Sequence, residues 1–183
     1  MARKHPADVE ESVVLVSPTG EPIGQRLKSE VHDTETPLHL AFSLYLFDAD
    51  DRLLLTRRAL DKRTWPGGWT NTCCGHPAPG EPMEDAVRRR VGEELGLAVG
   101  PLECVLPDFA YTATDASGVV ENEICPVYRA RTLHPGADPL PNPAEVMDWK
   151  WGAWDDVVQA VQATPFVFSP WSVLQVDQLA VTG

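Results

Sequence analysis

The chain has 183 residues, of which 43% are hydrophobic and 23% charged, and its formal net charge is −12 at pH 7. This length and balance are typical of a globular protein with a buried core, and with no long apolar run we expect no membrane span. The acidic charge disfavours a nucleic-acid partner, because it repels a phosphate backbone.

The expected strands are short apolar segments bounded by turn residues. They cover 12–17, 38–47, 52–59 and 69–74, lie within 102–111 and 119–131, and end with 146–152. Helices are expected over 82–95, 153–162 and 170–181, and the Pro-rich segment 133–145 is expected to be a flexible loop. Strands with at least one helix between them predict one domain over 1–183 of the α/β or α+β class. It would have a mixed β-sheet flanked by helices, and flexible ends at 1–8 and 180–183.

The cysteines and the N-terminus predict the compartment. The cysteines are Cys73, Cys74, Cys104 and Cys125, and they lack the spacing of a disulfide framework. The N-terminal residues include basic ones but no apolar segment, so we expect no signal peptide. We therefore expect a cytoplasmic protein, and a monomer.

Two carboxylates stand close together in the segment VVENEICPVY. On a strand, Glu121 and Glu123 are two residues apart and point to the same face. Their apolar neighbours indicate partial burial, which is costly unless a cation, a positive partner or a shared proton compensates. An exposed edge strand with two solvated carboxylates is the alternative, and the pair alone does not decide between them.

Three histidines are candidate metal ligands together with this pair. They are His32, His39 and His76, and the other two histidines fall in expected loops. Imidazole and carboxylate together suit a divalent transition metal such as zinc, manganese or iron. The spacing matches neither a zinc finger nor a helical HExxH motif, so the fold would have to bring separate segments together.

The segment 75–97, GHPAPGEPMEDAVRRRVGEELGL, resembles the Nudix box G-x5-E-x7-R-E-U-x-E-E-x-G-U, where U is apolar. In that family a loop and helix hold Mg²⁺ against a diphosphate through glutamates. The match departs at one position, where Arg90 stands in place of a metal-binding glutamate of the hydrolases, and this puts diphosphate hydrolysis in doubt. Basic residues elsewhere suit phosphate binding: Lys28, Arg57, Arg58, Lys62, Arg63 and Arg88 to Arg90.

With the motifs TNTCCGHP, YTATDASGVVENEICPVY, FSPW, LHLAFS and TRRAL, the chain resembles type I isopentenyl diphosphate isomerases over roughly residues 9–175. The resemblance implies a Nudix-like fold and interconversion of isopentenyl and dimethylallyl diphosphate. It implies a metal site formed by His32, His39, His76, Glu121 and Glu123 for manganese, zinc or iron. It also implies a Mg²⁺ ion that Glu94 holds against the substrate diphosphate, and diphosphate-binding residues Lys28, Arg58, Lys62 and Arg90.

The resemblance further implies Cys74 and Glu123 as the proton-handling groups, Tyr111 as an assistant of Glu123, and Trp171 facing the carbon skeleton. Alkene protonation gives a tertiary carbocation, which needs a strong acid, a stabilising aromatic face and exclusion of water. Cys73 would be a packing residue. The tryptophans Trp149, Trp151 and Trp154 are candidates for excluding water, but core positions are the simpler interpretation.

Three other functions remain open. A Nudix diphosphatase would release phosphate, and Arg90 argues against it. A diphosphate-binding or metal-storing module would bind its ligand without turnover, and would not explain why Cys74 and Tyr111 accompany the metal ligands. A redox protein is a weak alternative, because adjacent cysteines are not a C-x-x-C motif.

Overall fold

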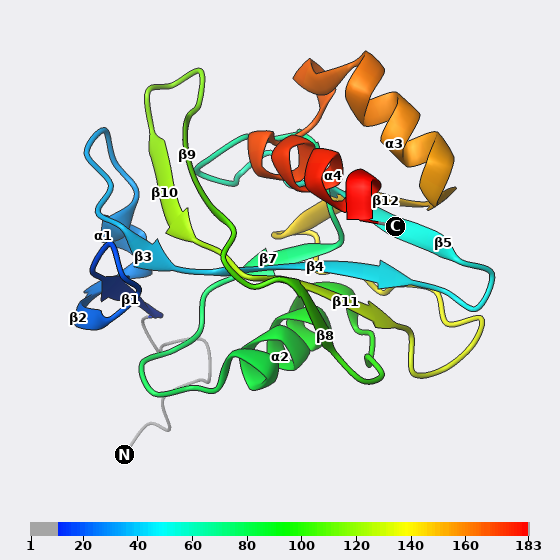
Figure 1. Cartoon of the computed structure of the whole chain (residues 1–183), viewed down its shortest axis with the longest axis horizontal. Helices are drawn as coiled ribbons and strands as arrows, with labels where there is room; N and C mark the ends of the chain where they lie inside the picture. Colours follow the sequence, from blue (N-terminus) through cyan, green and yellow to red (C-terminus); the bar gives the residue numbers. More distant parts are fainter. Residues whose placement is uncertain (1–10, 183) are drawn as a thin grey trace.

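Two β-sheets form the centre of the protein in this computed structural model, which describes residues 11–182 (Figure 1). The larger sheet has the order β12-β5-β4-β11-β8, with β6 on β5 and β7 on β4. Its strands are β4 (Phe42–Phe47), β5 (Arg52–Arg58), β6 (Trp69–Thr70), β7 (Cys73–Gly75), β8 (Glu103–Leu106), β11 (Val127–Arg131) and β12 (Val146–Ala153). The smaller sheet has the order β2-β1-β3-β10-β9. It contains β1 (Ser12–Val16), β2 (Pro22–Leu27), β3 (His39–Leu40), β9 (Ala110–Thr114) and β10 (Val120–Ile124).

The helices cover both faces of the larger sheet. The bounds are α1 (Lys28–Val31), α2 (Met83–Leu95), α3 (Trp154–Ala163), a 3-10 turn η2 (Pro165–Val167) and α4 (Pro170–Thr182). Figure 1 shows α2 on one side of β4, and α3 and α4 on the other. Both sheets are mixed, because β4 pairs with β11 and β3 with β10 in parallel while the other pairs are antiparallel. The predicted mixed sheet flanked by helices is confirmed.

Strand β4 separates two hydrophobic cores. Phe42, Leu44 and Leu46 pack on the side of α2, whereas Tyr45 packs on the side of α3 and α4. Because both faces are covered, the strand is apolar almost throughout. Its polar exception, Ser43, shares the face of Tyr45 and is fully buried.

Helix α2 begins and ends as its sequence predicts. Pro82 precedes it, and Gly96 ends it in the left-handed conformation (φ 63°) with its N–H donated to the Gly92 carbonyl. Arg89 donates two 2.8 Å hydrogen bonds to the Glu81 carboxylate and a third, of 3.3 Å, to the His76 carbonyl. These hydrogen bonds hold the loop before α2 against the helix.

The structure differs from the predicted elements in three ways. Strand β2 and helix α1 were not predicted, because nearly all of β2 is an exposed edge with no alternation of apolar residues. The expected strand 69–74 is two strands, β6 and β7, interrupted at Asn71. Likewise, the segments 38–47 and 119–131 each divide into two strands that belong to different sheets.

The loop 133–145 is attached to the end of α2. The Leu140 and Asn142 backbone N–H groups donate to the carbonyls of Leu95 and Glu94, each at 2.8 Å. Leu133, at the start of the loop, donates to the Ala98 carbonyl at 2.9 Å, and the flexibility of the loop stays a prediction. The predicted flexible segment 1–8 and Gly183 lie outside the described residues, and 180–182 belong to α4.

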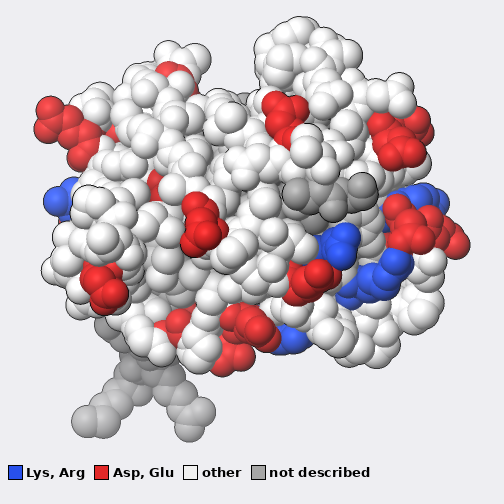
Figure 2. Space-filling view, in the orientation of Figure 1, with Lys and Arg blue, Asp and Glu red and all other residues white. Residues whose placement is uncertain are grey.

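The surface is acidic in character, as the composition requires. Figure 2 shows acidic side chains scattered over one face, with basic side chains gathered mainly at its right-hand edge beside acidic ones. None of the four cysteines is in a disulfide, as predicted. No helix within 11–182 has the length and apolar content needed to cross a bilayer.

Candidate active site

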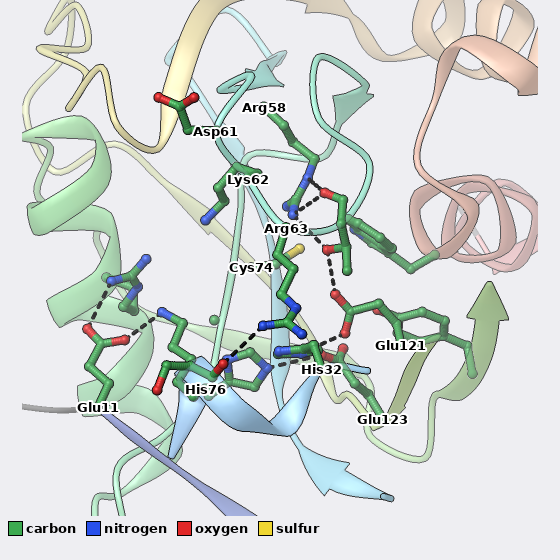
Figure 3. Close-up of a pocket in the computed structure, with 17 residues that line it drawn as sticks. Glu11, His32, Arg58, Asp61, Lys62, Arg63, Cys74, His76, Glu121 and Glu123 are labelled. Carbon is green, nitrogen blue, oxygen red and sulfur yellow. Dashed lines mark hydrogen bonds and ion pairs between the residues drawn. The ribbon is translucent and has the colours of Figure 1, made fainter. Parts of the chain in front are cut away.

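A cavity of about 490 Å³ opens where the two sheets, the segment after β5 and the N-terminus of α4 meet (Figure 3). It is lined by all but two of the residues to which the resemblance assigns a role in the site. The exceptions, His39 and Glu94, each contact a lining residue: His39 lies 3.4 Å from Glu123, and Glu94 lies 2.5 Å from Arg90. The fold therefore brings the predicted site together from segments that are spread along the chain from Lys28 to Trp171.

The cavity has a metal end, formed by His32, His39, His76, Glu121 and Glu123. One ligand atom from each histidine and from Glu123 lies within 4.8 Å of the others, a suitable grouping for one ion. Glu121 is outside that group, but its Oε2 lies 3.0 Å from His32 Nε2. The sheet register explains the convergence, because Glu123 lies opposite His39 on β3 and opposite Tyr111 on β9.

The polar atoms of this end fit a bound cation. Within the described residues, His32 Nε2, His39 Nε2, His76 Nδ1 and Glu121 Oε2 are buried without a hydrogen bond. His39 Nδ1 donates to the Pro37 carbonyl at 2.9 Å, which leaves Nε2 with its lone pair facing the group. Thr64 donates a 2.7 Å hydrogen bond to Glu121 Oε1 and fixes that carboxylate. Unpaired buried atoms are costly, and a transition metal would satisfy those that face it; His76 turns Nε2, and not Nδ1, toward Glu123.

Two members of the metal end, His76 and Glu123, favour the protonation states that bind a metal. Burial lowers the pKa of His76 to about 4, so its ring is neutral at pH 7. Burial opposes ionisation of Glu123, but the His39 and His76 rings beside it outweigh burial and hold that pKa well below the usual range. Neutral imidazole and ionised carboxylate are the forms that bind metals. An acid role for Glu123 requires in addition that it acquire a proton.

The two adjacent cysteines face opposite sides of the larger sheet. Cys74 pairs with Ser43 and Cys73 with Leu44, so each shares the face of its partner. Cys74 lines the cavity, whereas Cys73 is 2% exposed in the core against α2. Burial raises the pKa of the Cys74 thiol to about 11, so it holds its proton at pH 7. The placement agrees with Cys74 as the reactive cysteine and Cys73 as a packing residue.

Aromatic side chains close the inner part of the cavity. The Trp171 ring lies 5.8 Å from Tyr111 and 5.3 Å from Trp65, and the Arg58 guanidinium lies 5.2 Å from its centroid. This ring face therefore already holds a cation. Burial, followed by the charges of Glu123 and Glu121, raises the pKa of Tyr111 well above its usual value, so it remains a phenol. The tryptophans of β12 and Trp154 pack in the two cores, as expected.

The opposite side of the cavity is a cation end, formed by Lys28, Lys62 and Arg90. Each has a carboxylate partner: Glu11 for Lys28, Glu145 for Lys62, and Glu94 for Arg90. Arg58, between the two ends, donates instead to the carbonyl and hydroxyl of Thr64. Figure 3 shows Lys62 and Glu11 on one side of the cavity and the metal end on the other.

Three members of the predicted basic set lie elsewhere. Arg57 donates to the Gly67 carbonyl, Arg88 to the carbonyls of Val99 and Gly100, and Arg89 is bound to Glu81. They stabilise loops because backbone carbonyls need donors. Arg63, in contrast, does line the cavity and donates to the Ser29 carbonyl.

Sequence reasoning missed several residues of the site. Thr64 holds Glu121, and Asn71 hydrogen-bonds both Cys74 and Trp171. Glu145, from the end of the Pro-rich loop, pairs with Lys62 and lies 3.3 Å from Arg90. Each has a partner that is distant in sequence, which no local pattern identifies. The one local signal is the position of Asn71, three residues before Cys74.

Comparison with known proteins agrees with this geometry. The NUDIX domain family matches residues 37–175. A solved protein from Deinococcus radiodurans is similar in fold, with a TM-score of 0.63 at 21% identity over 84% of this chain and 90% of its own. A MutT NUDIX hydrolase from Burkholderia pseudomallei has a TM-score of 0.57 at 24% identity over 77% and 97%. At this identity they are evidence of fold alone.

The class of protein is therefore a NUDIX domain, with the box on 75–97 and α2. Curated relatives are more specific. The isopentenyl-diphosphate Delta-isomerase of Frankia alni is 57% identical over 176 residues, covering 96% of this chain and 88% of the relative. That of Agromyces mediolanus is 55% identical over 178 residues, covering 97% and 85%. The chain belongs to the isopentenyl-diphosphate Delta-isomerase family.

Proposed function

We propose that this protein is an isomerase that interconverts isopentenyl diphosphate and dimethylallyl diphosphate. The observation that carries the proposal is one cavity that combines a cation end with Cys74, Glu123 and Trp171. The relatives, more than 50% identical over nearly the whole chain, bear the name of this activity. The substrate joins an anionic diphosphate to a short alkene, and the cavity has a separate region for each.

The cation end would bind the diphosphate. Lys28, Lys62 and Arg90 line the cavity and can donate charge-assisted hydrogen bonds to phosphate oxygens. The binding of the substrate would exchange the carboxylate partners Glu11 and Glu145 for phosphate. Glu94, next to Arg90, would hold a Mg²⁺ ion that neutralises the diphosphate.

The metal end would bind one transition metal, manganese, zinc or iron, through His32, His39, His76, Glu121 and Glu123. When bound, this ion would supply positive charge that fixes the Glu123 carboxyl and tunes its acidity. His39 stays oriented by the Pro37 carbonyl, and Glu121 by Thr64, whichever ion is present.

The isomerisation moves one double bond by two proton transfers. A proton adds to the terminal alkene carbon, the positive charge forms on the tertiary carbon, and the chain carbon next to it loses a proton. Cys74 and Glu123 would be the two proton-handling groups, with the Tyr111 phenol beside Glu123. One of them would donate the proton that adds and the other would accept the proton that leaves, so the pair as a whole keeps the same number of protons. In the reverse reaction the roles exchange.

Trp171 would stabilise the carbocation. An aromatic face attracts positive charge without forming a bond to it, whereas a carboxylate or water would capture the cation. The ring is 2% exposed and lines the cavity, and Arg58 already lies against it. The buried rings of Trp171 and Tyr111 form the apolar surface of this part of the cavity, beside the charged Arg58.

The rival hydrolase is disfavoured by Arg90. This side chain points into the carboxylate group of α2 and pairs with Glu94 and Glu93, so a cation stands where hydrolases need a metal-binding glutamate. Proton NMR of the purified protein with isopentenyl diphosphate and Mg²⁺ in D₂O tests the proposal. We expect deuterium-labelled dimethylallyl diphosphate with no phosphate released. Release of phosphate, or binding without turnover by the metal-replete protein, would reject it.

A further inference from the structure

Asn71 lies between β6 and β7 and is 1% exposed, yet its side chain makes five hydrogen bonds. The amide nitrogen donates to the carbonyls of Leu44 and Cys73, each at 3.1 Å. The amide oxygen accepts from the Thr70 hydroxyl at 2.9 Å, the Trp171 indole at 3.1 Å and the Cys74 thiol at 3.3 Å. Such a satisfied buried network specifies a single arrangement.

The orientation of the Asn71 amide follows from its partners. Both amide hydrogens point to backbone carbonyls, which can only accept. The indole of Trp171 can only donate. A rotated amide would place NH₂ against the indole N–H and oxygen against the two carbonyls, so the observed orientation is the one that all partners accept. The oxygen therefore faces Cys74 and Trp171 together.

The Asn71 amide oxygen links Cys74, a proposed proton-handling group, to Trp171, the proposed stabiliser of the carbocation. Cys74 comes from β7, and Trp171 from α4, which is a hundred residues beyond Asn71 in sequence. The indole has a single N–H, so one hydrogen bond fixes the tilt of the ring. The thiol is held from its other side by Ser43 at 3.4 Å, whose own hydroxyl accepts a 2.9 Å bond from Gln175.

We propose that Asn71 is a positioning residue, whose amide oxygen sets the Cys74 thiol and the Trp171 ring at one fixed spacing around the reacting carbons. This inference rests on the proposed roles of Cys74 and Trp171 in the isomerisation. It predicts that Asn71 affects turnover more than substrate affinity, because none of its hydrogen bonds reaches the cation end.

The test begins with wild-type turnover of isopentenyl diphosphate, since an inactive wild type would reject the proposed function and not this inference alone. The variant Asn71→Ser replaces the amide by a smaller polar side chain and so removes the link between Cys74 and Trp171. We expect kcat to fall about 10- to 100-fold, as misplacement of reacting groups does, with KM changed by less than about threefold. A folded Asn71→Ser protein with wild-type kcat, or with only a raised KM, would overturn the inference.

The matched control is Thr70→Val, which deletes another donor to the same oxygen but leaves both links in place. Its kcat should stay within about twofold of wild type, as expected of a change outside the link. If it falls as far as that of Asn71→Ser, general loosening of this region explains the loss, and the inference is wrong.

A double-mutant cycle with Trp171→Phe separates positioning from a structural role. Phe keeps an aromatic face but lacks the N–H that donates to Asn71. In the Asn71→Ser background this hydrogen bond is already lost, so Trp171→Phe removes nothing further from the link. The combined loss in kcat should be smaller than the product of the single losses by about threefold or more. Independent, multiplicative losses would contradict the link. If Asn71→Ser does not fold, Trp171→Phe alone should lower kcat about threefold to tenfold, and an unchanged kcat would overturn the inference.

Discussion

The two ends of the cavity satisfy their charges in opposite ways. At the metal end, histidine nitrogens and a Glu121 oxygen are buried without a hydrogen bond. At the cation end, Lys28, Lys62 and Arg90 each already have a carboxylate partner. The metal end thus has unpaired ligand atoms that a cation would satisfy, whereas the cation end is neutralised internally and must exchange partners to hold an anion. We therefore expect changes at the metal end to affect catalysis, and changes at the cation end to affect substrate binding.

The largest expected effect is that of Glu123→Gln at the metal end. This variant removes both a charged metal ligand and a proton-handling group, so kcat should fall about 10³-fold or more. Metal content, measured by emission spectroscopy, should fall as well. Glu103→Gln is the matched control, because Glu103 is exposed and pairs with Arg129 outside the cavity. Wild-type turnover by Glu123→Gln would remove Glu123 from the mechanism.

The next effect distinguishes the adjacent cysteines. Cys74→Ala should lower kcat about 10²- to 10⁴-fold, because a proton-handling group is lost. Cys73→Ala should keep most of its activity and lose about 1 kcal/mol of unfolding free energy, because it only leaves a small cavity in the core. Steady-state kinetics and urea unfolding of both variants measure these effects. An inactive Cys73→Ala beside an active Cys74→Ala would mean that the two roles are reversed.

A smaller effect, on affinity, is expected at the cation end. Lys62→Met should raise KM about tenfold with kcat nearly unchanged, because a charge-assisted hydrogen bond to the diphosphate is lost and Glu145 is left unpaired. Lys150→Met, an exposed change on β12, is the control and should leave KM as in the wild type. A reduced kcat at unchanged KM would place Lys62 with the chemistry and would break the division between the ends.

The smallest effect is a pH dependence of stability at the cation end. Burial opposes ionisation of Glu145, but Lys62 and Arg90 outweigh it and lower its pKa from 4.5 to about 2. A lowered folded-state pKa stabilises the protein above about pH 4.5, and this contribution disappears as pH falls through about 2. Glu145→Gln should therefore lose more unfolding free energy at pH 6 than at pH 3, by urea unfolding. An equal loss at both pH values would contradict this ion pair.

Much of the cavity could be predicted because its signals are local. Glu121 and Glu123 share a face by the strand period, and both are 6% exposed beside the histidines. The Nudix box on α2 is recognised by the spacing of its residues, and the end of the helix by Gly96 at the C-cap. The convergence of His32, His39 and His76 could not follow from periodicity, and depended on the resemblance.

Other parts depend on contacts that no sequence pattern carries. Asn71 interrupts a strand because its side chain donates to the carbonyls of Leu44 and Cys73. Leu44 lies on the neighbouring strand β4. Glu145 reaches Lys62 from more than eighty residues away along the chain. Strand β2 has no apolar period because it is an exposed edge. Long-range hydrogen bonds and edge strands are decided by the tertiary structure and not by local preference.

The most direct test of the two-ended cavity separates turnover from binding after metal removal. The purified protein would be stripped with a chelator and dialysed, then given Mg²⁺ and isopentenyl diphosphate in D₂O, with affinity measured by calorimetry. We expect deuterium incorporation to be lost and then restored by manganese, zinc or iron, while the affinity for the diphosphate changes by less than about fivefold. Continued isomerisation by protein shown to be metal-free, or loss of binding together with turnover, would contradict the account.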